Sequence, residues 1–168
     1  MDEPVGAAFA RVVADLIGQP CWGVLAGKRT GSAFTLDLGV MHRRAVPVPN
    51  PSLPVTTRNY EGDYGLYVEC PWRVRTDDAV LASWDDKEDD DGPMVAALER
   101  LVGTTVVSAS VVAPALDLRL GFDNGLVLDV FASGSPRSDD DDYSIFTPLV
   151  IYAVGRGGRV ETEERVSD

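Results

Sequence analysis

The stretch from residue 116 to residue 131 restricts the fold more than any other part of the sequence. Apolar side chains occupy every second position from Leu116 to Phe122, as in a strand with one buried face. Residues 123–125 are Asp-Asn-Gly, and an Asn-Gly pair between apolar strands favours a tight hairpin turn. The apolar run 126–131 supplies the second strand. The sequence therefore predicts an antiparallel hairpin with one face against a core.

Two other segments predict helices, and most of the remaining chain predicts strands. Apolar residues recur at helical spacing over 5–17, before Gly18, and again from Pro93 to Gly103. Strand patterns cover 21–26, 32–40, 42–48, 64–70, 72–76, 104–113, 115–122, 125–132, 143–147, 149–154 and 159–162. Four prolines between residues 47 and 54 exclude a central strand there. We therefore predict an α+β protein with a mostly antiparallel β-sheet and two helices.

The length of 168 residues fits a single α+β domain spanning 1–168. Two pairs of short strings are similar, 15–18 with 100–103 and 63–67 with 142–146. An internal duplication, a helix plus hairpins twice over 5–84 and 93–162, would explain them. Each copy alone would bury too little apolar surface, so the copies would share one core. Chance similarity of short apolar strings is the alternative explanation.

The charge balance indicates which partners to expect. The chain carries 27 acidic and 15 basic residues, for a net charge of −12. Such a field repels nucleic acid and anionic membranes and attracts basic surfaces. We therefore expect a basic protein partner and neither nucleic acid nor membrane, with solubility alone as the alternative explanation. The contact candidates lie in and beside two acidic runs: Trp84, Asp85, Asp86, Asp89, Asp90, Asp91, Asp139, Asp140, Asp141, Asp142 and Tyr143.

The compartment is predicted from the cysteines and the apolar runs. Cys21 and Cys70 each lie in an apolar stretch, where a buried and reduced thiol is expected. The first residues lack the basic and apolar segments of a signal peptide. No apolar run reaches the ~20 residues that cross a bilayer. We therefore expect a cytoplasmic protein.

Motifs for catalysis or metal binding are missing from the sequence. His42 is the only histidine, and Arg43 and Arg44 beside it disfavour its charged form. The sequence contains no HExxH, GxSxG or GxxxxGK[ST] motif. An EF-hand loop aligned on the acidic run before the second helix puts Lys87 and Leu98 at ligand positions, where carboxylates are required. We predict a protein that is not an enzyme and binds no metal or cofactor.

Several strings resemble one family. They are LIGQPCWGV at 16–24, FTLDLG at 34–39, CPWRV at 70–74, the segment 97–103 and LRLGFDNGLVLDV at 118–130. Together they resemble an uncharacterised family of small bacterial α+β proteins with G-x-P-C-W-G-V and W-R-[IV] motifs. That family has no assigned activity, so the resemblance implies no catalytic residues.

Two functional hypotheses follow. The first is an immunity-type inhibitor that binds a basic partner protein such as a toxin through its acidic surface. The alternative is a small-molecule or peptide-binding module with a pocket between the sheet and the helices. Its candidate residues are His42, Tyr67, Trp72 and Arg73. Exposed edge strands are compatible with a homodimer but do not predict one.

Overall fold

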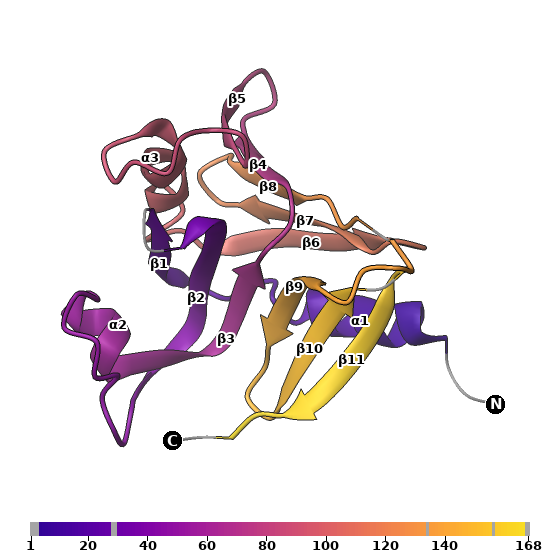
Figure 1. Cartoon of the computed structure of the whole chain (residues 1–168), viewed down its shortest axis with the longest axis horizontal. Coiled ribbons are helices and arrows are strands. Elements are labelled where there is room, and N and C mark those ends of the chain that lie inside the picture. The colour runs from indigo at the N-terminus through magenta and orange to yellow at the C-terminus, as the bar shows by residue number, and fades with distance from the viewer. Residues whose placement is uncertain (1–3, 28–29, 134, 156, 167–168) are drawn as a thin grey trace.

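The computed structural model describes residues 4–27, 30–133, 135–155 and 157–166. In this part of the chain, two antiparallel sheets lie together with three short helices (Figure 1). The helices are α1 (Val5–Ala14), α2 (Val55–Asn59) and α3 (Pro93–Glu99). The α+β prediction is confirmed. None of these helices has the length and apolar character needed to cross a bilayer.

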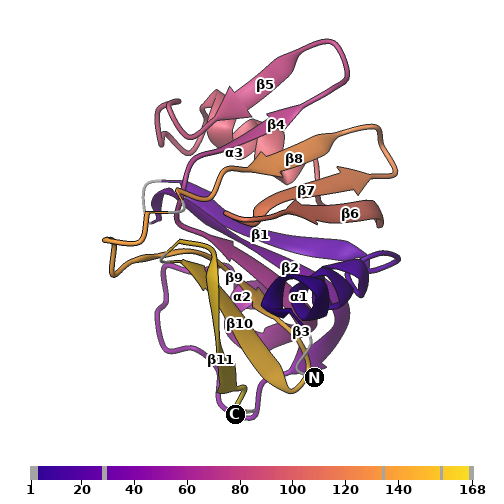
Figure 2. The same cartoon turned by 90° about the vertical axis from the view of Figure 1, so that its right-hand side faces the viewer.

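Eleven strands form the two sheets within the described residues. The six-stranded sheet has the order β1 (Cys21–Gly27), β2 (Gly31–Arg43), β3 (Tyr60–Val68), β9 (Asp141–Phe146), β10 (Val150–Gly155) and β11 (Arg159–Glu164). The five-stranded sheet has the order β5 (Val80–Ser83), β4 (Trp72–Arg75), β8 (Val127–Val130), β7 (Asp117–Phe122) and β6 (Val106–Val112). Figure 2 shows the two sheets set at an angle to each other.

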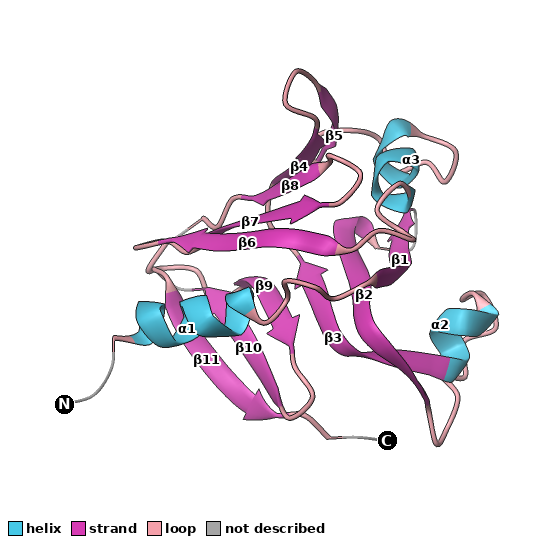
Figure 3. Cartoon of the chain, turned by 180° about the vertical axis from the view of Figure 1, so that it is seen from behind, coloured by secondary structure: helices cyan, strands magenta, loops and turns pink. Residues whose placement is uncertain are grey.

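The two halves of the chain follow a similar order of elements, although α2 in the first half and β11 in the second have no counterpart. In the first half, β1 to β3 pair in the six-stranded sheet, and β4 and β5 then enter the five-stranded sheet. In the second half, β6 to β8 pair in the five-stranded sheet, and β9 to β11 then enter the six-stranded one. The helix α1 contacts the edge strands β6 and β11, and α3 contacts the edge strands β1 and β5 (Figure 3). Each sheet is therefore completed by the other half of the chain.

One of the two similar string pairs does not mark equivalent places in this topology. Residues 63–67 lie in β3 and residues 142–146 lie in β9, and these strands are direct antiparallel partners. By order along the chain, the counterpart of β9 is β4 and the counterpart of β3 is β8. Aromatic and apolar residues are typical of strands in general. The similarity of residues 63–67 to residues 142–146 is therefore explained by strand formation and does not indicate equivalent positions in two repeats.

The predicted hairpin is confirmed as β7 and β8, with one difference in its turn. A two-residue Asn-Gly turn would need positive φ at both residues, but in this loop only Gly125 has it, at 83°. The amide of Gly125 donates to the Phe122 carbonyl, and the amide of Phe122 donates to the Leu126 carbonyl. The loop therefore has three residues, and the side chain of Asn124 donates to the Arg100 carbonyl instead.

Other boundaries also differ from the prediction. The expected strand 32–40 continues to Arg43 in one strand, β2, whose pairing with β3 shifts register between Leu38 and Met41. Residues 44–48 of the expected strand 42–48 are not in a strand. Gly39 allows this irregularity with a φ of 82°. The short elements α2 and β5 were not predicted, because five and four residues are too few to show a hydrophobic period.

The core lies between the sheets and under α1 and α3. Trp72 is buried, and its ring meets that of Phe34 edge-on at a centroid distance of 5.0 Å. The Trp72 indole Nε1 donates to the Ser32 carbonyl at 2.7 Å, which satisfies its only polar group. Both cysteines are free and buried, as expected, and burial raises the pKa of Cys21 and Cys70 to about 12. They are inert thiols at neutral pH.

Candidate functional site

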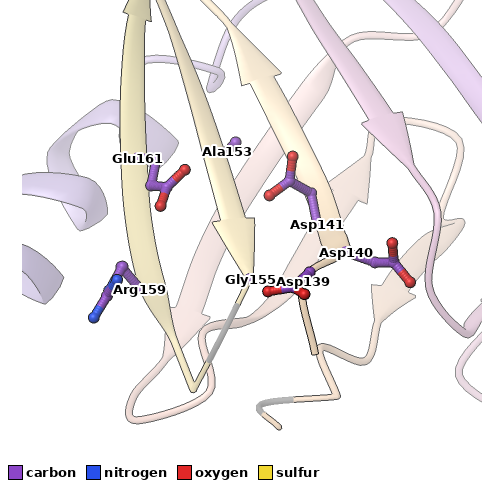
Figure 4. Close-up of a pocket in the computed structure, with 7 residues that line it drawn as sticks. All are labelled: Asp139, Asp140, Asp141, Ala153, Gly155, Arg159 and Glu161. Atoms are coloured by element: carbon purple, nitrogen blue, oxygen red, sulfur yellow. The ribbon is translucent and has the colours of Figure 1, made fainter. Parts of the chain in front are cut away.

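The second acidic run ends in a small concave site on the outer face of the six-stranded sheet. The site has a volume of about 140 Å³ and lies across β9, β10 and β11. We call it the acidic concavity, and it is lined by Asp139, Asp140, Asp141, Ala153, Gly155, Arg159 and Glu161. Figure 4 shows the carboxylates of Asp141 and Glu161 pointing toward each other across β10. Arg159 points to the far side of β11, away from them.

Strand register brings these carboxylates together. Glu161 of β11 lies opposite Ala153 of β10, and Gly155 of β10 lies opposite Asp141 of β9. Side chains at positions two apart share a face of a strand, so Ala153 and Gly155 form the floor between the two acidic side chains. The floor is low because both residues are small.

A side chain at Gly155 would close this floor. A Cβ atom there would lie 3.0 Å from the carbonyl oxygen of Asp140 and 3.3 Å from Oδ1 of Asp141. Such contacts are tighter than ordinary van der Waals contact. Gly155 therefore keeps the concavity open.

A β-bulge gives Asp141 its place in the site. Val154 pairs with Tyr143 and Gly155 pairs with Asp141, so Asp142 is an extra residue on β9. A bulge changes the direction in which the following side chains point. Asp141 consequently shares the outer face with Glu161, although Tyr143, two residues along, points into the core.

The electrostatics of the concavity are repulsive. Burial raises the pKa of Asp141 above its ordinary value, and Glu161, Asp142, Asp140 and Glu163 raise it further. Arg159 is the one cationic residue among the described residues that line the site. Among the described residues that line the site, like charges around Asp141 and Glu161 outnumber opposite ones, and an incoming cation would relieve the repulsion between these two carboxylates.

Two predicted contact residues of the second run are not accessible. Tyr143 is fully buried, and its hydroxyl donates to the Leu116 carbonyl at 2.6 Å. Asp142 is only 7% exposed. The prediction that these two residues contact a partner was wrong, because the alternation of β9 and its bulge turn them away from solvent.

The first acidic run lies in the loop between β5 and α3, on other elements than the acidic concavity. Asp85, Asp89, Asp90 and Asp91 are exposed there. Asp86 is half-buried and accepts a hydrogen bond from the Ser83 amide at 2.8 Å, which closes the turn. Trp84 is partly buried and packs at the edge of the core. None of these residues lines the concavity.

The four residues of the alternative pocket are not brought together. Trp72 is buried in the core, while Arg73 is on the opposite face of β4 and pairs with Asp129. His42 is exposed near the end of β2, where its Nε2 pairs with Oδ1 of Asp63. Tyr67 is half-buried in β3. A shared pocket for these residues was a wrong prediction, because successive residues of one strand face opposite ways.

Sequence reasoning missed a second cavity on the six-stranded sheet. It has a volume of about 310 Å³, and Asp37, Arg44, Glu61, Tyr64, Phe146 and Arg165 contribute to its lining. Burial raises the pKa of Asp37, although Arg44 and Arg165 act to lower it. The sequence signal was Asp37, a lone carboxylate within the apolar strand 34–39. A carboxylate costs free energy when it is buried without a partner.

The chain was compared with protein-family models, curated proteins and solved structures, and none matches. The resemblance to the uncharacterised bacterial family therefore stays a prediction. In the part of the chain that the structure describes, no three histidine, cysteine or carboxylate side chains are grouped to hold a metal ion.

Proposed function

We propose that the protein is a non-catalytic binding protein that holds a basic partner protein against the acidic concavity. An immunity-type inhibitor of a basic toxin, acting in the cytoplasm, is the function that these features support best. The observation that carries the proposal is the pair of facing carboxylates, Asp141 and Glu161, with neighbours of like charge. Their repulsion is relieved when a partner brings an ammonium or guanidinium group between them.

The size of the concavity favours a protein side chain over a small-molecule ligand. Its volume of about 140 Å³ is well below the ~300–1,000 Å³ of typical small-molecule pockets. One water molecule takes ~30 Å³ of liquid volume, so the site has room for the cationic end of one arginine or lysine. The rest of such an interface would lie on the exposed surface around it.

The net charge of −12 supports the same proposal through kinetics. Complementary charge steers two proteins together and speeds their association, and salt weakens this effect. An inhibitor must reach its toxin before the toxin reaches its target. Fast, salt-sensitive association is therefore the expected behaviour.

A matched pair of double variants tests the proposal. Asp141→Asn with Glu161→Gln removes the two facing charges, while Asp89→Asn with Asp91→Asn removes two exposed charges from the other run. Proteins captured by the wild type from a lysate of its host are identified, purified and tested for toxicity and for neutralisation. We expect the first variant to bind the neutralised toxin about 10–100-fold more weakly, mainly through a slower association rate. The second variant should bind like the wild type.

A third variant tests shape without changing charge. Ala153→Leu fills the floor between Asp141 and Glu161 and keeps both carboxylates. We expect it to weaken binding of the same toxin as well. Equal binding by all three variants and the wild type, with equal salt dependence, would exclude the concavity as the contact site.

The second cavity supports a different candidate function, a small-molecule-binding module. Its volume of about 310 Å³ falls within the range of small-ligand pockets. Asp37 would accept hydrogen bonds from a ligand there, because it accepts none from the described residues. A metabolite screen by thermal shift tests it: a ligand that stabilises the wild type and not Asp37→Asn favours the module, and no stabilising ligand counts against it.

A further inference from the structure

The outer face of the five-stranded sheet carries a cluster of positively charged side chains, opposite in sign to the acidic concavity. Asp129 of β8 is buried, with 4% of its side chain exposed. Its Oδ2 accepts hydrogen bonds from Nε of Arg73 at 2.8 Å and from Nε of Arg75 at 2.7 Å. Its Oδ1 accepts one from Nε of Arg119 at 2.7 Å. We call Arg73, Arg75 and Arg119 the arginine cluster.

Three different strands build this cluster. Arg73 and Arg75 lie two residues apart on β4, Arg119 lies on β7, and β8 runs between these strands. Asp129 is in register with Arg73 on one side and with Arg119 on the other. Cross-strand partners share one face of a sheet, so the three guanidinium groups surround a single carboxylate.

The cluster keeps a net positive charge. Burial alone would raise the pKa of Asp129, but the hydrogen bonds from the three arginines outweigh it and lower that pKa to about 2. Asp117 is the other carboxylate at the nearby cavity of about 200 Å³, and its Oδ1 accepts a hydrogen bond from the Ala132 amide. Three guanidinium groups therefore face two carboxylates, in a chain whose net charge is −12.

Most donors of the cluster remain unused. A guanidinium group has five N–H donors, and Nε is the one that Arg73 and Arg119 give to Asp129. Among the described residues, neither side chain has a second hydrogen-bond acceptor. Arg73 is held over the ring of Phe131 at 4.9 Å, and 57% of the Arg119 side chain is exposed. Because Asp129 fixes the Nε atoms of Arg73 and Arg119, the terminal nitrogens of these two guanidinium groups are held in position to donate to an additional acceptor.

We infer that the arginine cluster binds a phosphate-type oxyanion on the outer face of the five-stranded sheet. Guanidinium groups match the oxygens of phosphate with paired hydrogen bonds. Asp129 orients the three side chains through their Nε atoms and leaves the outer nitrogens of Arg73 and Arg119 for the ligand, while Nη1 of Arg75 donates to the Thr76 carbonyl. A second anion also relieves the repulsion among three cations that share one carboxylate. This site is independent of the acidic concavity, since it lies on the other sheet and has the opposite sign.

The experiment titrates the full chain with inorganic phosphate at constant ionic strength. The arginine Nε–Hε signals are followed by NMR, and heat is measured by calorimetry. Acetate serves as the control for a singly charged anion, and Arg159→Gln serves as the control for loss of one arginine on the other sheet. Arg119→Gln removes an exposed member of the cluster, so its fold is expected to survive, which circular dichroism checks.

Saturable shifts of the Arg73 and Arg119 signals by phosphate, and not by acetate, are the expected result. Arg119→Gln should weaken phosphate binding about tenfold, the size expected for one lost bidentate contact. Arg159→Gln should bind like the wild type. Arg119→Lys keeps the positive charge but loses the paired donors of the guanidinium group. Its affinity for phosphate should lie between those of the wild type and Arg119→Gln.

The inference is overturned if phosphate produces no saturable shift, or if acetate and phosphate act alike. It is also overturned if Arg119→Gln and Arg159→Gln lose affinity equally, because the effect would then be general screening. Two further titrations, with phenyl phosphate and with a phosphoserine peptide, distinguish the sources of the phosphate group. Tighter binding of the peptide than of free phosphate assigns a phosphorylated protein, and the reverse order assigns a small metabolite.

Discussion

Asp141 and Asp129 occupy comparable places on the outer faces of the two sheets, and their surroundings have opposite effects. Asp141 is crowded by other carboxylates, which with burial raise its pKa. Asp129 is held by three arginines, which lower its pKa to about 2. The net charge of the chain describes neither place. The sign of a local electrostatic field in this protein therefore depends on which strands are neighbours.

The charged side chains of the two regions also affect folding stability in different ways. The contacts of Asp129 are made within the protein, so they stabilise the fold. Among the described residues the repulsion around Asp141 is not relieved, so it is a cost to the fold that a bound cation would reduce. Such a trade between stability and function is common at binding sites. The following predictions test this difference.

The largest expected effect is that of Asp129→Asn. The variant leaves three guanidinium groups without their anion, and removing one member of a buried ion cluster typically costs ~3–5 kcal/mol. Because the arginines are partly exposed, solvent screens them, and we expect about 2–3 kcal/mol of lost unfolding free energy. Urea denaturation at neutral pH measures it. A loss below that of an average surface substitution would show that the cluster does not stabilise the fold.

Acid pH offers a second measurement on the same residue. The pKa of Asp129 falls from 3.8 in the reference state to about 2 in the folded state. Its stabilisation is therefore complete above about pH 4 and is lost as the pH falls toward 2, and it amounts to about 2 kcal/mol. The wild type should lose this much more stability than Asp129→Asn between pH 4 and pH 2. Parallel stability curves for the two proteins would contradict the prediction.

Tyr143→Phe separates the acidic concavity from the core beneath it. The variant removes the buried hydroxyl that donates to the Leu116 carbonyl and leaves that acceptor unsatisfied. We expect a loss of about 1.5 kcal/mol of unfolding free energy with unchanged binding of the proposed basic partner. Weaker binding of the proposed partner by a variant that is still fully folded would return Tyr143 to the contact surface.

The smallest expected effect, and the only one of opposite sign, is that of Asp141→Asn. Its carboxylate is destabilising when ionised, because a raised folded-state pKa means that the protonated form favours folding. Neutralising it should raise the unfolding free energy at neutral pH by about 0.5 kcal/mol, a size typical of exposed charges. Thermal unfolding at pH 7 measures this. Destabilisation would mean that the region is not repulsive.

Much of the fold was predictable because strand and helix patterns are local. Alternation identified the β7–β8 hairpin, and helical spacing with Pro93 identified α3. The acidic character of the second run was also evident from sequence. What failed was the orientation of single residues such as Tyr143, because a bulge is invisible in an alternating pattern.

Residue order along the chain thus determined the elements, the buried faces and the total charge, since each depends on side chains a few positions apart. Only the tertiary structure decided that Glu161 would face Asp141, and that Arg73 and Arg119 would meet at Asp129. The meeting of Arg73 with Arg119 requires strands from both halves of the chain to lie in the same sheet. Strand exchange of this kind is set by burial of the shared core, over sequence separations that no local period reports.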